Sequence, residues 1–116
     1  MEIETKSVGS VEIISLNGRL DAYSSNEVER SINTLIDGGC VRIVVNLEGV
    51  EYISSSGLRV MLASLKRLRK LNGELSLACL RPYVKEVFDI AGFTQLFEIC
   101  DEEDDAVKRC SAGTGV

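Results

Sequence analysis

The sequence contains no histidine, and none of its four cysteines stands at the Cys-x-x-Cys spacing of zinc and redox motifs. Histidines and closely spaced cysteines supply the ligands of most zinc sites, so we expect neither a metal nor another cofactor. Thiols are normally kept reduced in the cytosol. We therefore also expect free thiols at all four positions, Cys40, Cys79, Cys100 and Cys110.

The chain also lacks an uncharged apolar run long enough to cross a membrane. Its first four residues, Met-Glu-Ile-Glu, have neither the basic nor the apolar region of a secretory signal. These absences predict a cytoplasmic protein with no membrane insertion. Acidic residues outnumber basic residues by 18 to 13, and the net charge is −5. Because phosphate binding requires a basic face, this charge argues against nucleic acid as a partner.

The composition provides enough apolar side chain for one hydrophobic core. The 116 residues are 45% apolar and 27% charged, which is typical of a single globular domain. There is no internal repeat and no linker that would divide the chain. We expect one domain over residues 1–110 and a frayed tail over residues 111–116. The acidic run at residues 101–105 lacks the glycine and spaced oxygens of a calcium loop and is typical of a helix start.

A strand, a cluster of serines and an amphipathic helix form the unit around which the chain is organised. β-Branched residues predict a strand over residues 41–47, and its two adjacent valines indicate burial on both faces. The serine cluster, residues 54–56, precedes a helix predicted over residues 58–71, since hydroxyl side chains favour helix starts. Apolar residues recur at helical spacing in that helix: Leu58, Met61, Leu62, Leu65 and Leu68.

The other elements follow from spacing and turn residues. Residues 2–8 and 11–16 predict a strand hairpin, with Asn17-Gly18 closing the second strand and a loop over residues 18–23. Ser24 stands three residues before Glu27, the spacing of a capping box, and predicts the start of the first helix. Further strands are predicted at residues 74–80 and 97–99, and further helices at residues 83–91 and 101–110.

Strands and helices alternate after the first hairpin, a pattern typical of an α/β domain. We expect a single domain with a mixed sheet of about four or five strands and about four helices packed on it. In such a domain the serine cluster lies at the carboxyl end of a buried strand. Loops at that edge commonly hold the sites of open α/β sheets.

Three motifs in this order resemble a known family. Residues 41–58, VRIVVNLEGVEYISSSGL, are similar to the signature of the STAS domain family, and in particular to its bacterial anti-sigma factor antagonist branch. Gly18-Arg19-Leu20-Asp21 matches the Gly-x-Leu-Asp loop of that family, and residues 82–92 match its helix that ends in a glycine. The resemblance extends over nearly the whole chain and implies a single STAS-type domain.

The resemblance implies a partner-switching protein rather than an enzyme. Members of this branch bind an anti-sigma factor that is also a serine kinase of the histidine-kinase-like ATPase class, and binding frees the sigma factor. The kinase phosphorylates a serine at the start of the central helix, the phosphorylated protein dissociates, and a serine phosphatase resets it. The phosphoacceptor falls on Ser55 here. The matching loops assign partner contacts to Asp21, Ser54, Ser56, Gly57, Leu58 and Arg59.

One position departs from the family pattern. The family motif Asp-Ser-Ser/Thr/Ala-Gly has an aspartate where this chain has Ser54, which removes a carboxylate beside the acceptor and leaves open which kinase acts and whether one acts at all. The residues agree with a substrate rather than a catalyst, because no histidine or second motif supplies a base to activate Ser55. Free N–H groups at a helix start tolerate a phosphate, so we expect it to act at the interface and not on the fold.

Other interpretations stay open from the sequence alone. The serines could simply cap the helix, Gly57 could serve close packing, and Asp21 could hold a turn. The domain could instead be an unswitched STAS subunit of a lipid-transport or signalling assembly. An enzyme or small-ligand binder is a further class, although no Gly-x-x-x-x-Gly-Lys loop supports nucleotide binding.

Overall fold

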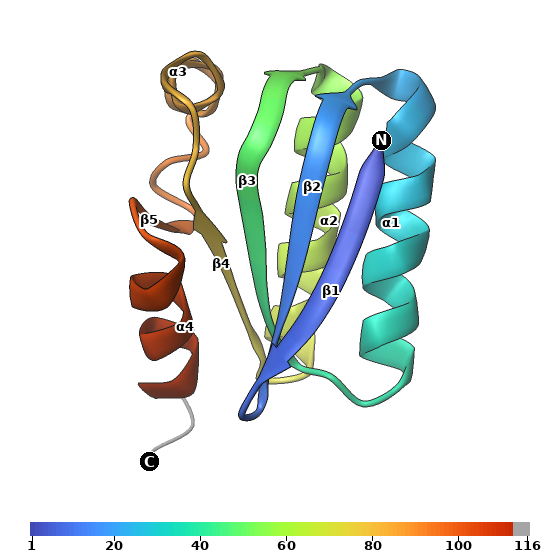
Figure 1. Cartoon of the computed structure of the whole chain (residues 1–116), viewed down its shortest axis with the longest axis vertical. Helices are drawn as coiled ribbons and strands as arrows, with labels where there is room; N and C mark the ends of the chain where they lie inside the picture. The colour runs from blue at the N-terminus through green and yellow to red at the C-terminus, as the bar shows by residue number, and fades with distance from the viewer. Residues whose placement is uncertain (113–116) are drawn as a thin grey trace.

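A five-stranded sheet in the order β1-β2-β3-β4-β5 forms the centre of the computed structural model, which describes residues 1–112 (Figure 1). β1 (Glu2–Val8) pairs antiparallel with β2 (Val11–Leu20). β2, β3 (Arg42–Ile53), β4 (Glu74–Ala78) and β5 (Glu98–Cys100) run parallel to one another. The predicted α/β domain with a mixed sheet is confirmed, and so is the hairpin at its first edge.

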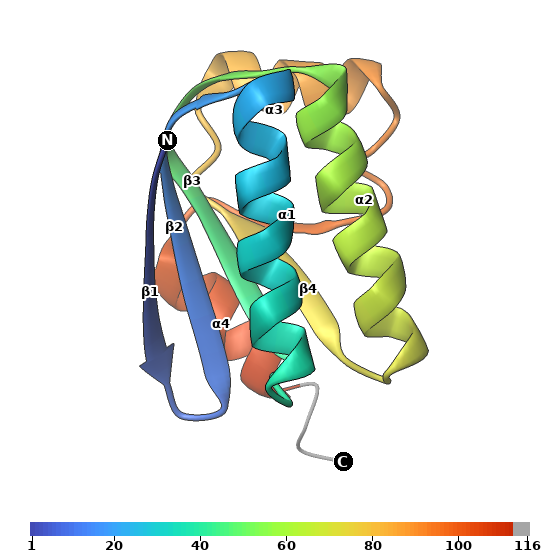
Figure 2. The same ribbon diagram turned by 90° about the vertical axis from the view of Figure 1, so that its right-hand side faces the viewer.

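Four helices in the described part of the chain cover this sheet. α1 (Ala22–Asp37) and α2 (Ser55–Lys70) pack side by side on one face, and α4 (Glu103–Ala112) covers the other face (Figures 1 and 2). α3 (Pro82–Ile90) lies at the end of the sheet toward which the parallel strands run. Within residues 1–112, no helix combines the length and the apolar character needed to cross a membrane.

The strands bury apolar side chains on both faces because helices cover both. The larger cluster lies between the sheet and helices α1, α2 and α3, and includes Ile43, Val45 and Phe88. The smaller cluster lies under α4 and includes Val44 and Cys110. Val44 and Val45 of β3 are therefore adjacent in the chain but buried in different clusters, as the predicted burial of that strand on both faces requires.

Two strands extend further toward the serine cluster than the sequence predicted. β2 continues to Leu20 and β3 to Ile53, so the prediction of a loop over residues 18–23 was wrong. Register shifts between Ser15 and Asn17, and between Gly18 and Arg19, let β2 follow β3 past the Asn-Gly pair. Gly18 has a φ of 128°, which glycine adopts without a steric penalty. The pair therefore forms part of an irregular strand and not a turn.

α2 begins at Ser55, earlier than the predicted start at residue 58, and Asn72 stands just beyond its end with a φ of 57°. Leu65 is only 4% exposed, in agreement with the apolar stripe. Leu62, predicted on the same stripe, is only half-buried. The buried face of α2 includes two small residues, Gly57 and Ser64, which let the helix lie close to its neighbours.

Smaller differences occur toward the end of the chain. β4 ends at Ala78 rather than at residue 80, β5 begins one residue later than predicted, and α4 begins at Glu103. α4 continues through Ala112, so residues 111 and 112, which were expected in the tail, are helical. Residues 113–116 of that tail lie outside the described residues. The four cysteines are free.

Candidate functional site

Two helices start side by side at the carboxyl edge of the sheet. Leu20 at the end of β2 pairs with Ile53 at the end of β3. A single residue then separates each strand from its helix, Asp21 before α1 and Ser54 before α2. The Ser54 N–H donates to the Leu20 carbonyl oxygen at 2.9 Å and ties the two chain segments together. We call residues 21–23 and 54–59 the two-helix edge (Figure 2).

Ser54 is the N-cap of α2. Its Oγ accepts a hydrogen bond from the Gly57 N–H at 3.2 Å, and its carbonyl oxygen accepts one from the Leu58 N–H at 3.0 Å. A side-chain oxygen at this position satisfies one of the N–H groups that a helix start leaves unpaired. The capping role that the sequence left open for all three serines therefore falls on Ser54, whose hydroxyl is committed to the helix.

Ser55 is the first residue of α2, and its side chain is exposed to solvent. Within residues 1–112 its hydroxyl takes no part in a hydrogen bond, whereas the neighbouring Ser54 caps the helix and Ser56 is half-buried. No histidine stands anywhere in the sequence to activate this hydroxyl as a nucleophile. Ser55 therefore offers an accessible hydroxyl group that has no neighbouring histidine to act as a base.

Gly57 lets the first turn of α2 rest directly on the strand ends. A Cβ at this position would lie 2.8 Å from Ile53 Cγ1 and 2.8 Å from Leu20 Cγ. It would also lie 3.1 Å from the Leu20 carbonyl oxygen. Gly57 is itself buried, so of the two roles considered from the sequence the geometry favours close packing over direct contact with a partner.

Asp21 is the N-cap of α1, and the prediction that Ser24 is the cap was wrong. The Asp21 carboxylate accepts hydrogen bonds from the N–H groups of Tyr23 at 3.0 Å and of Ser24 at 2.9 Å. Ser24 completes the capping box from inside the helix, because its Oγ accepts from the Asp21 N–H at 3.1 Å. The hydrogen bond from the Ser24 N–H is the main cause that lowers the pKa of the Asp21 carboxyl group. The edge therefore carries a fixed negative charge at neutral pH.

Tyr23 is a candidate contact residue that the sequence did not indicate. Its side chain is 93% exposed, and it follows directly on the Asp21 cap in the first turn of α1. Exposed tyrosines are enriched at protein interfaces because they offer a large apolar ring together with a hydroxyl group. The sequence assigned this residue to a loop. Recognising Asp21 as the cap would have placed Tyr23 on the helix, outside the buried stripe of Val28, Ile32 and Ile36.

Leu58 and Arg59, the last residues of the edge, point in different directions. Leu58 is half-buried and packs against the main core cluster. Arg59 is exposed. Two of the predicted site residues, Ser55 and Arg59, are thus accessible to solvent. Asp21 and Ser54 are helix caps, and Gly57 and Leu58 take part in packing.

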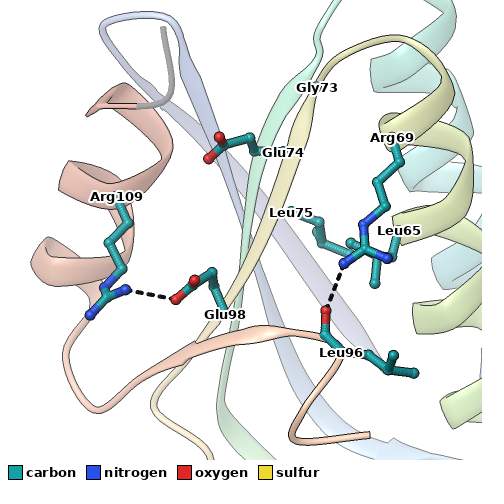
Figure 3. Close-up of a pocket in the computed structure, with 8 residues that line it drawn as sticks. All are labelled: Leu65, Arg69, Gly73, Glu74, Leu75, Leu96, Glu98 and Arg109. Carbon is teal, nitrogen blue, oxygen red and sulfur yellow. Dashed lines mark hydrogen bonds and ion pairs between the residues drawn. The ribbon is translucent and has the colours of Figure 1, made fainter. Parts of the chain in front are cut away.

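A separate groove of about 520 Å³ lies at the other end of α2 (Figure 3). Two arginines in its wall are already engaged, since Arg69 donates to the Leu96 carbonyl oxygen at 3.0 Å and Arg109 pairs with Glu98 at 2.7 Å. The remaining lining residues are Leu65, Gly73, Glu74 and Leu75. Arg69 follows Ser55 by fourteen residues, about 21 Å along the helix axis, so the groove is not part of the two-helix edge.

The fold and this edge define a small α/β domain in which two capped helices start side by side at one end of the sheet. The chain belongs to the STAS domain family, whose model matches residues 2–106. It is 35% identical over 106 residues to a Bordetella bronchiseptica protein assigned as the anti-sigma factor antagonist BtrV, with 91% of each chain covered. It is 30% identical over 108 residues to the anti-sigma F factor antagonist of Paenibacillus polymyxa, with 92% of each covered.

A solved structure shows the same fold. The phosphorylated form of the Bacillus cell fate determinant SpoIIAA matches with a TM-score of 0.74 and 24% identity, over 93% of this chain and 98% of that chain. The predicted resemblance to the STAS family is confirmed. The relatives favour the anti-sigma factor antagonist branch over the alternative of a scaffold in another assembly.

Proposed function

We propose that this protein is an anti-sigma factor antagonist that binds an anti-sigma factor through the two-helix edge and so releases a sigma factor. Family membership carries the proposal, together with relatives named for this activity that align over nine-tenths of their length. The edge suits a protein partner because it combines an exposed aromatic ring, Tyr23, with charged groups of both signs, Asp21 and Arg59. The protein acts in the cytoplasm, where transcription takes place.

Phosphorylation of Ser55 controls this binding in our proposal. The anti-sigma factor is a serine kinase of the histidine-kinase-like ATPase class. In the reaction the Ser55 Oγ attacks the γ-phosphorus of ATP, ADP leaves, and a base on the kinase takes the hydroxyl proton. A serine phosphatase hydrolyses the phosphoserine. Among the three serines, Ser55 has the free and exposed hydroxyl that such a transfer needs. The protein itself is the substrate of both enzymes and not a catalyst.

The phosphate should weaken binding without unfolding the domain. It adds about −1.5 to −2 charges at neutral pH. At the first position of α2, the helix N-terminus favours that charge locally, so the fold tolerates it. The same charge lies on the two-helix edge, which also carries the Asp21 carboxylate, and its hydration and its repulsion of acidic groups oppose docking of the partner.

Phosphosite mapping tests the acceptor. The purified protein is incubated with ATP, Mg²⁺ and the anti-sigma factor encoded nearest its gene, and phosphopeptides are sequenced by mass spectrometry. We expect phosphate on Ser55, none on the Ser55→Ala variant, and continued phosphorylation of Ser56→Ala, the matched control one residue away. Phosphate on Ser54 or Ser56 with Ser55 unmodified would overturn the assignment.

Calorimetric titration with the same partner tests the switch. The wild-type protein should bind in the absence of ATP and dissociate once ATP is added, whereas Ser55→Ala should stay bound. Ser55→Glu should bind more weakly than wild type, although one carboxylate carries less charge than a phosphate. Tight binding that ATP does not affect, without phosphate on any serine, would instead identify an unswitched scaffold.

A further inference from the structure

Ser55 and Arg59 share the exposed side of α2. The exposed residues of this helix recur at helical spacing, and Arg59 stands one turn after Ser55. Residues four apart on a helix have Cβ atoms about 5–6 Å from each other. Helical side chains also lean toward the N-terminus, so the surface that Arg59 covers lies over the turn that contains Ser55. A phosphate on Ser55 would therefore lie within reach of the Arg59 guanidinium group.

Arg59 is not engaged by the rest of the fold. Within residues 1–112 it forms neither an ion pair nor a hydrogen bond. Other arginines of α2 behave differently: Arg67 bonds Asn33 and Asp37 on α1, and Arg69 bonds the Leu96 carbonyl oxygen.

The helix itself offers no reason for a cation at this position. The first turn of α2 contains no acidic side chain to pair with, and the positive end of the helix dipole disfavours a nearby cation. Residues that break a local preference without a compensating contact are expected at functional sites.

We propose that Arg59 senses the state of Ser55, an inference that rests on the proposed phosphorylation of that residue. With Ser55 unmodified, the free guanidinium group binds a carboxylate on the partner. With Ser55 phosphorylated, the same group is held by the phosphate within the helix, in the fork geometry that arginine forms with phosphate oxygens. Phosphorylation then removes a contact from the interface in addition to adding a negative charge to it.

A titration of the protein alone tests the internal pair. Phosphoserine is incorporated at position 55 during translation, and the pKa for the second proton of the phosphate is measured by ³¹P NMR in the wild-type background and in Arg59→Gln. Arg59 favours the dianion, so this pKa should be about 0.15–0.4 unit lower in wild type than in Arg59→Gln, as expected for an exposed pair at this spacing. A merely structural role for Arg59 would not move this value.

Lys66→Gln is the matched control, because it removes the same charge from an exposed position on the same helix. Lys66 follows Ser55 by eleven residues, about 16 Å along the axis and beyond the screening length at physiological salt. The phosphate pKa of this variant should equal that of wild type. Equal values in wild type and Arg59→Gln, or an equal shift in Lys66→Gln, would overturn the proposal.

This outcome is independent of whether a kinase modifies Ser55 in the cell. If phosphosite mapping leaves Ser55 unmodified, the proposed phosphorylation switch at Ser55 fails while the titration still reports on the pair. If mapping succeeds and the titration shows no shift, only the role of Arg59 fails. Binding of the unphosphorylated protein to its anti-sigma factor gives the second readout: Arg59→Gln should lower affinity by roughly two- to fivefold, and Lys66→Gln should not. Unchanged affinity in Arg59→Gln would remove the partner contact from the proposal.

Discussion

Replacing Gly57 with alanine tests whether close packing of α2 on the strand ends positions the two-helix edge. The added methyl carbon would lie 2.8 Å from Ile53 Cγ1 and from Leu20 Cγ. Carbon atoms that are not bonded pack at about 3.5–4.0 Å. Leu20 Cγ is not the far end of a flexible chain, and the Leu20 carbonyl oxygen at 3.1 Å belongs to the backbone. The helix start or the strand ends must therefore move.

The size of the effect is the difference between two opposing terms. Extra volume in a well-packed core costs about 1–3 kcal/mol. Alanine is better than glycine inside a helix by about 1 kcal/mol, which offsets part of that cost. We expect Gly57→Ala to lower the free energy of unfolding by about 1–2 kcal/mol, which corresponds to a fall in Tm of about 3–10 °C for a domain of this size.

Urea unfolding followed by circular dichroism measures this difference. Ser56→Ala is the control, because it introduces alanine at the preceding position of the same turn without adding an atom next to the strand ends. It should stay within about 0.5 kcal/mol of wild type. A Gly57→Ala midpoint equal to or above that of wild type would refute the argument, because it would mean that the edge has room for a methyl group.

Three further predictions concern the core, the α1 cap and the thiols. Leu65→Ala should lower the free energy of unfolding by about 2–5 kcal/mol, since Leu65 is 4% exposed, and an equal loss in Leu62→Ala would contradict the assigned buried face. The pKa of Asp21 is lowered from its ordinary 3.8, so its contribution to stability is present above that value and is lost as the pH falls through the lower folded pKa. Asp21→Asn keeps a capping oxygen that does not titrate, so below about pH 4 the urea midpoint of wild type should fall relative to that of this variant. Urea midpoints that change in parallel with pH in the two proteins would exclude a role of the Asp21 charge. Burial raises the pKa of the Cys110 thiol, so Cys110 should react with a thiol reagent far more slowly in the folded protein than in the unfolded protein. Protein unfolded without reductant should titrate four free thiols, and a smaller number would indicate a disulfide.

The order and type of the elements could be predicted from the sequence because their hydrophobic periods are distinct. The boundaries near the site could not. Asn17-Gly18 is typical of a turn, yet here the pairing of β2 with β3 continues through two register shifts and overrides the local preference. Ser24 has capping-box spacing to Glu27, but its hydroxyl donates to the Arg19 carbonyl oxygen at 2.6 Å, which buries it inside the first turn and leaves the cap to Asp21.

The serine cluster and its place before a helix were evident from the sequence, but the different roles of its three serines were not. Which of the three serines caps the helix depends on the residue at which β3 ends, and β3 is longer than its apolar run suggests. The neighbourhood of Asp21 and Ser54 depends on the pairing of Leu20 with Ile53, a contact between segments far apart in the chain. Tyr23 became a candidate only once its exposure in the first turn of α1 was known.

The single-residue connections between strands and helices have a consequence for recognition. The chain passes from sheet to helix through one N-cap residue at each place, Asp21 and Ser54, so the two-helix edge contains no long loop. Ordering flexible segments is one of the main free-energy costs of association. For the backbone of the two-helix edge this cost should be small, because both connections are already ordered as helix caps. The partner should therefore encounter a surface already in its bound shape, and a phosphate on it should alter affinity through charge and contact alone.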